Sequence, residues 1–181
     1  MVYVFLADGF EEIEGLTFVD LLRRAGIETK TVSVMEGLKI TGAHKIQITA
    51  DTMFEENDYE AAKMLVLPGG MPGTLNLQNH EGLTALLKKH YEAGKKVAAI
   101  CAAPSILGDL GMLRGKRAVC YPGFEEKLSG AEAGTEKVAV DGNITTSRGL
   151  GTAIAFSLSL IAQLADEETA EKIRAGILYD C

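Results

Sequence analysis

Three short apolar runs constrain the fold of this chain more than any other feature of its sequence. They are VYVFLA (Val2–Ala7), MLVLP (Met64–Pro68) and VAAIC (Val97–Cys101), and none of them alternates between apolar and polar residues. A strand that is apolar at successive positions is typical of a mostly parallel sheet whose two faces are both covered by helices. The sequence therefore predicts an α/β fold, a three-layer sandwich of helices, sheet and helices.

The rest of the chain alternates between expected strands and expected helices. In segments such as Leu16–Leu22 and Leu83–Leu87, apolar residues recur three and four positions apart, as on one face of a helix. Gly26 closes the first helix after two arginines, and Asp166 is placed to cap a last helix that runs to about Ile177. The expected strands are Val2–Ala7, Thr29–Val34, Lys45–Thr49, Met64–Leu67, Val97–Ile100, Ala118–Tyr121, Val138–Val140 and Ile144–Thr146.

Size and composition indicate one domain that spans residues 1–181. Of the 181 residues, 47% are hydrophobic and 24% are charged, and the sequence contains no repeat, linker or low-complexity segment. A chain of this length buries enough surface to fold without disulfides or a structural metal. The uncharged segment Gly149–Ala165 is shorter than the roughly 20 apolar residues of a membrane span, so we expect a buried helix there.

Net charge and cysteine content indicate which binding partners and which cellular compartment to expect. Eighteen basic and 25 acidic residues give a net charge of −7, which disfavours nucleic acid and anionic membranes as partners. The three cysteines, Cys101, Cys120 and Cys181, form neither a disulfide framework nor a metal-ligand spacing. The first residues lack the basic and apolar regions of a signal peptide, so we expect a protein of the reducing cytoplasm.

The strongest candidate for chemistry is Cys101. Ligands of open α/β sheets bind at the carboxyl ends of the strands, and Cys101 directly follows an apolar strand. The small residues Ala102 and Ala103 permit the tight strand-to-helix turn of a nucleophile elbow, and Pro104 suits a first helical turn. The positive end of that helix would lower the thiol pKa and favour the thiolate. The alternative is a buried core cysteine without reactivity.

Two further strand ends carry flexible or acidic residues. The amides of Gly69 and Gly70, after the MLVLP run, can form an oxyanion hole or serve only a turn. Past the first strand, we expect Glu11 and Glu12 to interact only with the helix dipole. Glu14 lies further into the helix, where it could act as a base for the thiol or as an acid beside an oxidised sulfur. A carboxyl and a thiol so close together would share one proton.

The remaining motifs do not indicate a cofactor. The segment Arg148–Thr152 contains Gly-x-Gly but lacks the third glycine of a dinucleotide-binding loop, and the sequence has no Walker loop and no metal-binding pair. We therefore predict no metal, nucleotide or flavin. His44, His80 and His90 all precede Cys101, and we expect them on the surface or in loops rather than in a Cys–His pair.

Several of these segments together resemble the motifs of a known family, the ThiJ/PfpI superfamily. Within it, the chain is most similar to the branch of the parkinsonism-associated protein deglycase, and the similarity runs from end to end. The motifs that carry the resemblance, in matching order and spacing, are GFEEIE (Gly9–Glu14), VLPGG (Val66–Gly70), VAAICAAP (Val97–Pro104) and TTSRGLGT (Thr145–Thr152).

The resemblance implies a flavodoxin-like fold in a single domain related to class I glutamine amidotransferases, usually a homodimer. It assigns Cys101 as an easily oxidised nucleophile and Glu14 as its carboxyl partner. It also implies that the amides of Gly69, Gly70 and Ala102 bind the oxyanion.

Three positions depart from the family pattern. Ala102 stands where the peptidase branch has a His, which argues against proteolysis. Tyr121 replaces the His of a His-Pro pair near the site, where its hydroxyl could take over part of the role and line the substrate site. His44 replaces an Arg that lines the anion site of the family.

The resemblance leads to two hypotheses of different class. The first is a cysteine-dependent, cofactor-free glyoxalase or deglycase that acts on α-oxoaldehydes such as methylglyoxal or on their adducts. The second is a redox sensor or stress-responsive chaperone-like protein in which Cys101 is oxidised to sulfinic acid without turnover. An intracellular cysteine peptidase and a thiazole-monophosphate biosynthesis protein, other roles given to superfamily members, are the less favoured alternatives.

Overall fold

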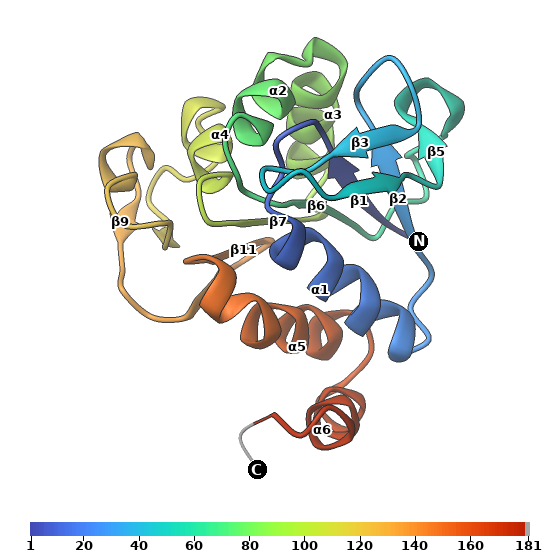
Figure 1. Ribbon diagram of the computed structural model, residues 1–181. Helices are drawn as coiled ribbons and strands as arrows, with labels where there is room; N and C mark the ends of the chain where they lie inside the picture. Colours follow the sequence, from blue (N-terminus) through green and yellow to red (C-terminus); the bar gives the residue numbers. More distant parts are fainter. Residues whose placement is uncertain (180–181) are drawn as a thin grey trace.

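The computed structural model describes residues 1–179 and arranges them in three layers, with a twisted sheet between two layers of helices (Figure 1). All neighbouring strands of the seven-stranded sheet are parallel except β10 and β11, which form an antiparallel edge. The predicted α/β sandwich with a mostly parallel sheet is confirmed. In spatial order the strands are β10 (Val138–Asp141), β11 (Ile144–Ser147), β7 (Lys96–Ile100), β6 (Met64–Leu67), β1 (Val2–Leu6), β2 (Thr29–Ser33) and β5 (Thr52–Met53).

The helices divide between the two faces of the sheet. On one face, α1 (Glu12–Arg24) and α5 (Ala153–Leu164) lie side by side, and α6 (Glu167–Gly176) packs against α5 (Figure 1). The other face is covered by α2 (Gly73–Asn79), α3 (Glu81–Glu92) and α4 (Pro104–Asp109). Short 3₁₀ turns complete the described chain at η1 (Phe54–Glu56), η2 (Glu125–Lys127) and η3 (Leu150–Thr152).

The two hydrophobic cores explain why the strands are apolar at every position. In β6, Leu65 and Leu67 pack into the core beneath α2, α3 and α4, whereas Met64 and Val66 pack toward α1 and α5. Successive side chains of a strand point to opposite faces, so a central strand between two helical layers needs apolar residues throughout.

Two expected strands differ from the structure. Residues 45–49 contribute only β4 (Gln47–Thr49), which pairs antiparallel with β3 (Lys39–Thr41) in a hairpin outside the main sheet. Residues 118–121 contribute only the end of β8 (Arg117–Ala118), which pairs with β9 (Glu132–Ala133).

The chain leaves the β8 ladder because its amides find other acceptors. The amide of Val119 donates to Thr146 Oγ1 at 2.9 Å, and the amide of Tyr121 donates to the carbonyl of Cys101 at 2.8 Å. These bonds carry the segment toward the end of β7, so its apolar residues are buried without forming a strand.

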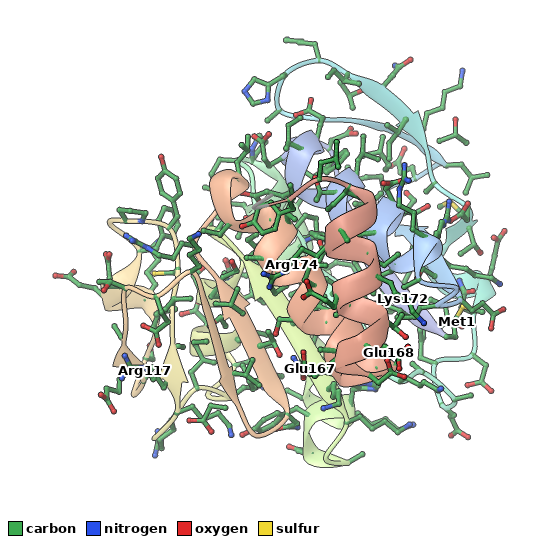
Figure 2. All side chains as sticks on the ribbon, turned by 90° about the horizontal axis from the view of Figure 1, so that it is seen from below. Met1, Arg117, Glu167, Glu168, Lys172 and Arg174 are labelled. Carbon is green, nitrogen blue, oxygen red and sulfur yellow. The ribbon has the colours of Figure 1, made fainter. Side chains whose placement is uncertain are left out.

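The predicted helix ends are largely confirmed. Gly26 has a φ of 72° just after α1, and Asp166 accepts a hydrogen bond from the Thr169 amide at 2.7 Å at the start of α6. The expected buried helix begins at Ala153, after η3. Figure 2 shows α6 from below, with Lys172 and Glu168 joined by a 2.8 Å ion pair on its outer side. Within residues 1–179, no helix has both the length and the apolar character needed to cross a membrane.

Candidate active site

Cys101 lies at the carboxyl end of β7 in a strained turn. Its φ is 65°, a left-handed conformation that a non-glycine residue adopts at a cost of about 1–3 kcal/mol. Two backbone bonds fix this geometry, because the Cys101 amide donates to Ser147 at 3.0 Å and its carbonyl accepts from Tyr121 at 2.8 Å. Pro104 begins α4 three positions later. The arrangement is that of a nucleophile elbow, with the thiol partly accessible to solvent.

Glu14 is the carboxyl group that meets the Cys101 sulfur. It lies in the first turn of α1, is 1% exposed, and accepts a hydrogen bond from the Gly69 amide at Oε2 over 2.9 Å. The Glu14 carboxyl also acts on the Cys101 thiol, since each group shifts the pKa of the other. The structure therefore brings together the two residues that the sequence put forward as nucleophile and carboxyl partner.

The glycine loop after β6 allows this close approach. A Cβ at Gly69 would lie 2.5 Å from Cys101 Cβ and 2.9 Å from Glu14 Oε2, so no larger residue fits between them. The backbone amides of Gly70 and Ala102 reach the Cys101 sulfur. The amide of Gly69 does not share this role, because it is bonded to Glu14. Of the three predicted oxyanion donors, Gly69 instead positions the Glu14 carboxylate, and the oxyanion role of Gly70 and Ala102 stays a prediction.

Burial controls the protonation of the pair. It raises the pKa of Glu14 to about 7, although hydrogen bonds from Cys101 and Gly69 act against this rise. Burial, together with the charge of an ionised Glu14, raises the pKa of the Cys101 thiol to about 12, while the amides of Gly70 and Ala102 oppose that shift. The lowered thiol pKa that the helix start predicted is therefore wrong, because burial, the largest cause, raises the pKa and the charge of Glu14 raises it further. A thiolate forms more easily when the proton rests on Glu14.

Tyr121 lies at the edge of the site with half of its surface exposed. A Cβ at Gly149 would be 3.3 Å from Cδ2 of the Tyr121 ring and 3.7 Å from Glu14 Oε1. Gly149, which has no side chain, is thus the residue that lies between the Tyr121 ring and the Glu14 carboxyl. This position suits a residue that contacts a substrate entering toward Cys101.

The three histidines lie in other parts of the structure. His80 accepts the Leu83 amide at 3.0 Å as the cap of α3, whereas His90 is buried within the same helix, so the expected surface or loop position is wrong for His90. His44 bonds to Glu12. None of them is among the groups that shift the Cys101 pKa, which agrees with the expectation that no Cys–His pair forms.

Sequence reasoning missed the role of Glu12. Its side chain is 1% exposed and accepts hydrogen bonds from the amide of His44 at 2.7 Å and from the amide of Ile46 at 3.4 Å, while His44 Nδ1 lies 2.9 Å from it. Glu12 thereby fastens the β3–β4 hairpin to the start of α1. Gly42 permits this contact, because a Cβ there would lie 2.2 Å from the Glu12 carboxyl, but the sequence alone does not pair the two residues.

Glu11, Glu12 and His44 also place ligand-type atoms within 4.8 Å of one another. Burial acts to raise the pKa of Glu12, but the hydrogen bonds from His44 and the backbone outweigh burial and lower it. The hydrogen bond to Glu12 raises the pKa of His44. The two shifts favour an ionised Glu12 beside a protonated His44, which is a clasp between two segments rather than an arrangement that needs a metal.

Glu12→Gln is expected to lower the free energy of unfolding by about 1–3 kcal/mol, because a buried acceptor of backbone amides is weakened. The matched control is Glu11→Gln, since Glu11 only lies near His44, at 3.5 Å. Urea unfolding at neutral pH measures the difference. The Glu12 pKa is lower in the folded state than its ordinary value of 4.5. The contribution of Glu12 to the free energy of unfolding is therefore fully present above pH 4.5 and is lost as the pH falls through the pKa of the folded state. Equal stability of the two variants would contradict the clasp.

The sandwich and the strained cysteine define an α/β protein with a nucleophile elbow. The model of the DJ-1/PfpI family matches residues 1–163, and the chain belongs to this family. The resemblance found in the sequence is thereby confirmed.

The chain is similar to known proteins over nearly its whole length. It is 39% identical over 180 residues to protein DJ-1 homolog A of Arabidopsis thaliana, covering 98% of this chain and 46% of that protein. The chain thus spans less than half of the plant relative. It is 35% identical over 166 residues to a protein named deglycase from Pyrococcus abyssi, covering 90% of this chain and 98% of that protein. The solved structure of oxidized Toxoplasma gondii DJ-1 is similar with a TM-score of 0.95 at 38% identity, covering 99% and 98% of the two chains.

Proposed function

We propose that this protein is a cysteine-dependent enzyme that converts α-oxoaldehydes such as methylglyoxal, or their adducts on other molecules, to 2-hydroxy acids. One observation carries the proposal: the buried Glu14 carboxyl, with its pKa raised to about 7, contacts the sulfur of a cysteine held at a strained elbow. A group that titrates near neutral pH can both accept and return a proton during a reaction. The relative named deglycase supports an adduct as a second form of substrate.

The chemistry begins at the aldehyde carbon of methylglyoxal. The Cys101 sulfur bonds to this carbon, and the thiol proton passes to the aldehyde oxygen, which gives a hemithioacetal. The amides of Gly70 and Ala102 face the reacting centre and stabilise negative charge that develops on oxygen.

Glu14 then moves a proton between two carbons. It takes the proton from the former aldehyde carbon and delivers it to the neighbouring keto carbon, while the hydroxyl proton of the hemithioacetal passes to the former keto oxygen. The first carbon is thereby oxidised and the second reduced. The result is a thioester of lactate on Cys101. Water hydrolyses this thioester to lactate and the free thiol, so water is the only co-reactant.

The proposal is tested by incubating the purified protein with methylglyoxal alone and measuring lactate by an enzymatic assay. We expect lactate to form in amounts that exceed the protein many times. If no lactate forms while mild peroxide adds two oxygens to Cys101, the alternative role as a redox sensor takes its place. That alternative is favoured by the same contact, because a protonated Glu14 can donate a hydrogen bond to an oxidised sulfur.

We also propose that the protein acts as a homodimer in the cytoplasm, with neither nucleic acid nor membrane as a partner. The net charge of −7 supports the exclusion of phosphate-rich surfaces. The dimer is supported by apolar residues exposed on α1, Ile13 at 51% and Leu16 at 39%. Ile46, 52% exposed, extends this patch, since its amide bonds to Glu12 beside Ile13.

Ile13→Asp together with Leu16→Asp is expected to turn the dimer into a monomer, because burying two carboxylates against an apolar partner is costly. Sedimentation velocity measures the change. Leu178→Asp is the matched control, since Leu178 is 79% exposed on the C-terminal segment. A wild-type protein that sediments as a monomer would refute the dimer.

A further inference from the structure

A groove leads away from the catalytic site along the end of the sheet. It has a volume of about 340 Å³ and lies between the Tyr121–Pro122 turn, the segment 135–137 and the loop 148–152. Gly149 joins it to the catalytic site, because a Cβ there would be 3.7 Å from Glu14 Oε1 and 3.3 Å from Tyr121 Cδ2. A substrate bound at Cys101 could therefore extend into this groove.

The charged residues that line the groove are both basic, Lys137 and Arg148, although the chain as a whole is acidic. Within residues 1–179 neither side chain forms an ion pair, and the Arg148 guanidinium donates only to the carbonyl of Thr135, at 3.3 Å. Glu136, the acidic residue between Thr135 and Lys137, forms an ion pair with Arg117. Arg148 thus remains available to a ligand, whereas Lys137 also lines a second cavity that contains Glu167 and Glu171.

The walls of the groove are fixed by buried hydrogen bonds. The hydroxyl of the buried Ser147 donates to the carbonyl of Lys137 at 2.7 Å and lies 2.7 Å from the hydroxyl of Thr152. The Thr152 hydroxyl in turn accepts the Gly149 amide at 3.1 Å. Both walls are therefore connected to β11, so the backbone segments that carry the two cations are held beside the catalytic site without a ligand.

We infer that this groove binds a carboxylate or phosphate group on the substrate, a few atoms away from the carbonyl that reacts with Cys101. Arg and Lys bind such groups through charge-assisted hydrogen bonds, and Arg can bind two oxygens at once. Tyr121 and Leu150, each 50% exposed, contact the apolar link between the anion and the carbonyl. The inference rests on the proposed function and specifies its substrate as an anionic α-oxoaldehyde or adduct.

The test compares two α-oxoaldehydes that differ only in their tail, 4,5-dioxopentanoate with a carboxylate and 2-oxopentanal with a methyl group. For the wild-type protein we expect kcat/KM to be at least about 10-fold higher with the carboxylate. Arg148→Gln should reduce this ratio about 10-fold, and Lys137→Gln by a smaller factor. The ratio is measured because general damage to the fold lowers both rates together. Hydroxypyruvaldehyde phosphate, compared in the same way, shows which of the two anions is preferred.

Arg114→Gln is the matched control, since it removes the same charge from an exposed residue outside the groove. It should leave the ratio unchanged. A ratio near one for the wild-type protein, or equal ratios for wild type and Arg148→Gln, would overturn the inference.

A second measurement tests anion binding in the groove independently of turnover. 4-Oxopentanoate has the carboxylate but no aldehyde, and it should slow the alkylation of Cys101 by iodoacetamide in the wild-type protein more than in Arg148→Gln. If no oxoaldehyde is turned over but this protection is seen, the proposed function fails and the groove stands. If turnover is seen without any preference or protection, the groove fails alone.

Discussion

Cys101→Ser is expected to abolish the formation of lactate from methylglyoxal, with a decrease in kcat of at least about 10⁴-fold. A serine hydroxyl has a far higher pKa than a thiol and needs a strong general base to attack a carbonyl. Glu14, with a pKa of about 7, is too weak a base to deprotonate a serine hydroxyl, and no histidine is among the groups that act on the Cys101 side chain. The measurement is lactate produced per protein per minute, with the variant purified beside the wild type.

Cys120→Ala is the control for this experiment. Cys120 is a buried thiol, 3% exposed, in the core beneath α4, and burial raises its pKa to about 11. The Cys120→Ala variant should therefore keep its activity and lose a small amount of stability. Turnover by Cys101→Ser at a rate near that of the wild type would refute covalent catalysis at Cys101. Loss of activity in both variants would instead point to damage of the fold.

Glu14→Gln is expected to lower turnover by about 10²–10⁴-fold and to change how Cys101 alkylation depends on pH. In the wild-type protein both groups are protonated at low pH. As the pH rises through about 7, the pair loses one proton, and the remaining proton is shared between the carboxyl and the sulfur. A fraction of thiolate appears in this step, so the alkylation rate rises near pH 7.

Loss of the second proton is opposed by burial and by the negative charge already present, which hold the Cys101 pKa at about 12. The wild-type profile should therefore have a first step near pH 7 and a second only at strongly alkaline pH. Glu14→Gln removes the carboxylate, so the first step disappears and one transition remains. That transition lies below the second wild-type step, because no adjacent charge opposes the thiolate.

The measurement is the rate of iodoacetamide labelling, followed by mass spectrometry for each cysteine peptide. Cys120 serves as an internal control, since its labelling should rise in one step and be the same in both proteins. Identical profiles of Cys101 in the wild type and in Glu14→Gln would contradict a shared proton.

Much of the fold could be predicted because burial on both faces leaves a clear pattern in the sequence. The runs that became β1, β6 and β7 are apolar at every position, and they form the centre of the sheet. The strands that were missed, β3, β5 and β9, are two or three residues long; β3 and β9 lie outside the main sheet, and β5 is its edge strand. Such short pairs depend on tertiary contacts rather than on local sequence.

The site was predicted in part for a similar reason. Cys101 could be found because it follows an apolar strand and precedes small residues and a proline, all of which are visible in the sequence. The choice of Glu14 among neighbouring acids needed the family resemblance. Glu12 and Glu14 point in directions about 200° apart on α1, and both are buried because the β3–β4 hairpin covers one and the Gly69 loop covers the other.

The sequence by itself determined the α/β sandwich, the elbow cysteine and the family, since each depends on residue types in fixed order. Only the tertiary structure decided which groups share protons and which amides remain free. The amide of Gly69 turned from a predicted oxyanion donor to a partner of Glu14, and the thiol pKa moved upward instead of downward. The physical reason is that hydrogen-bond partners and burial come from segments far apart in the chain, and the electrostatic effect of a neighbour depends on distances that the order of residues does not contain.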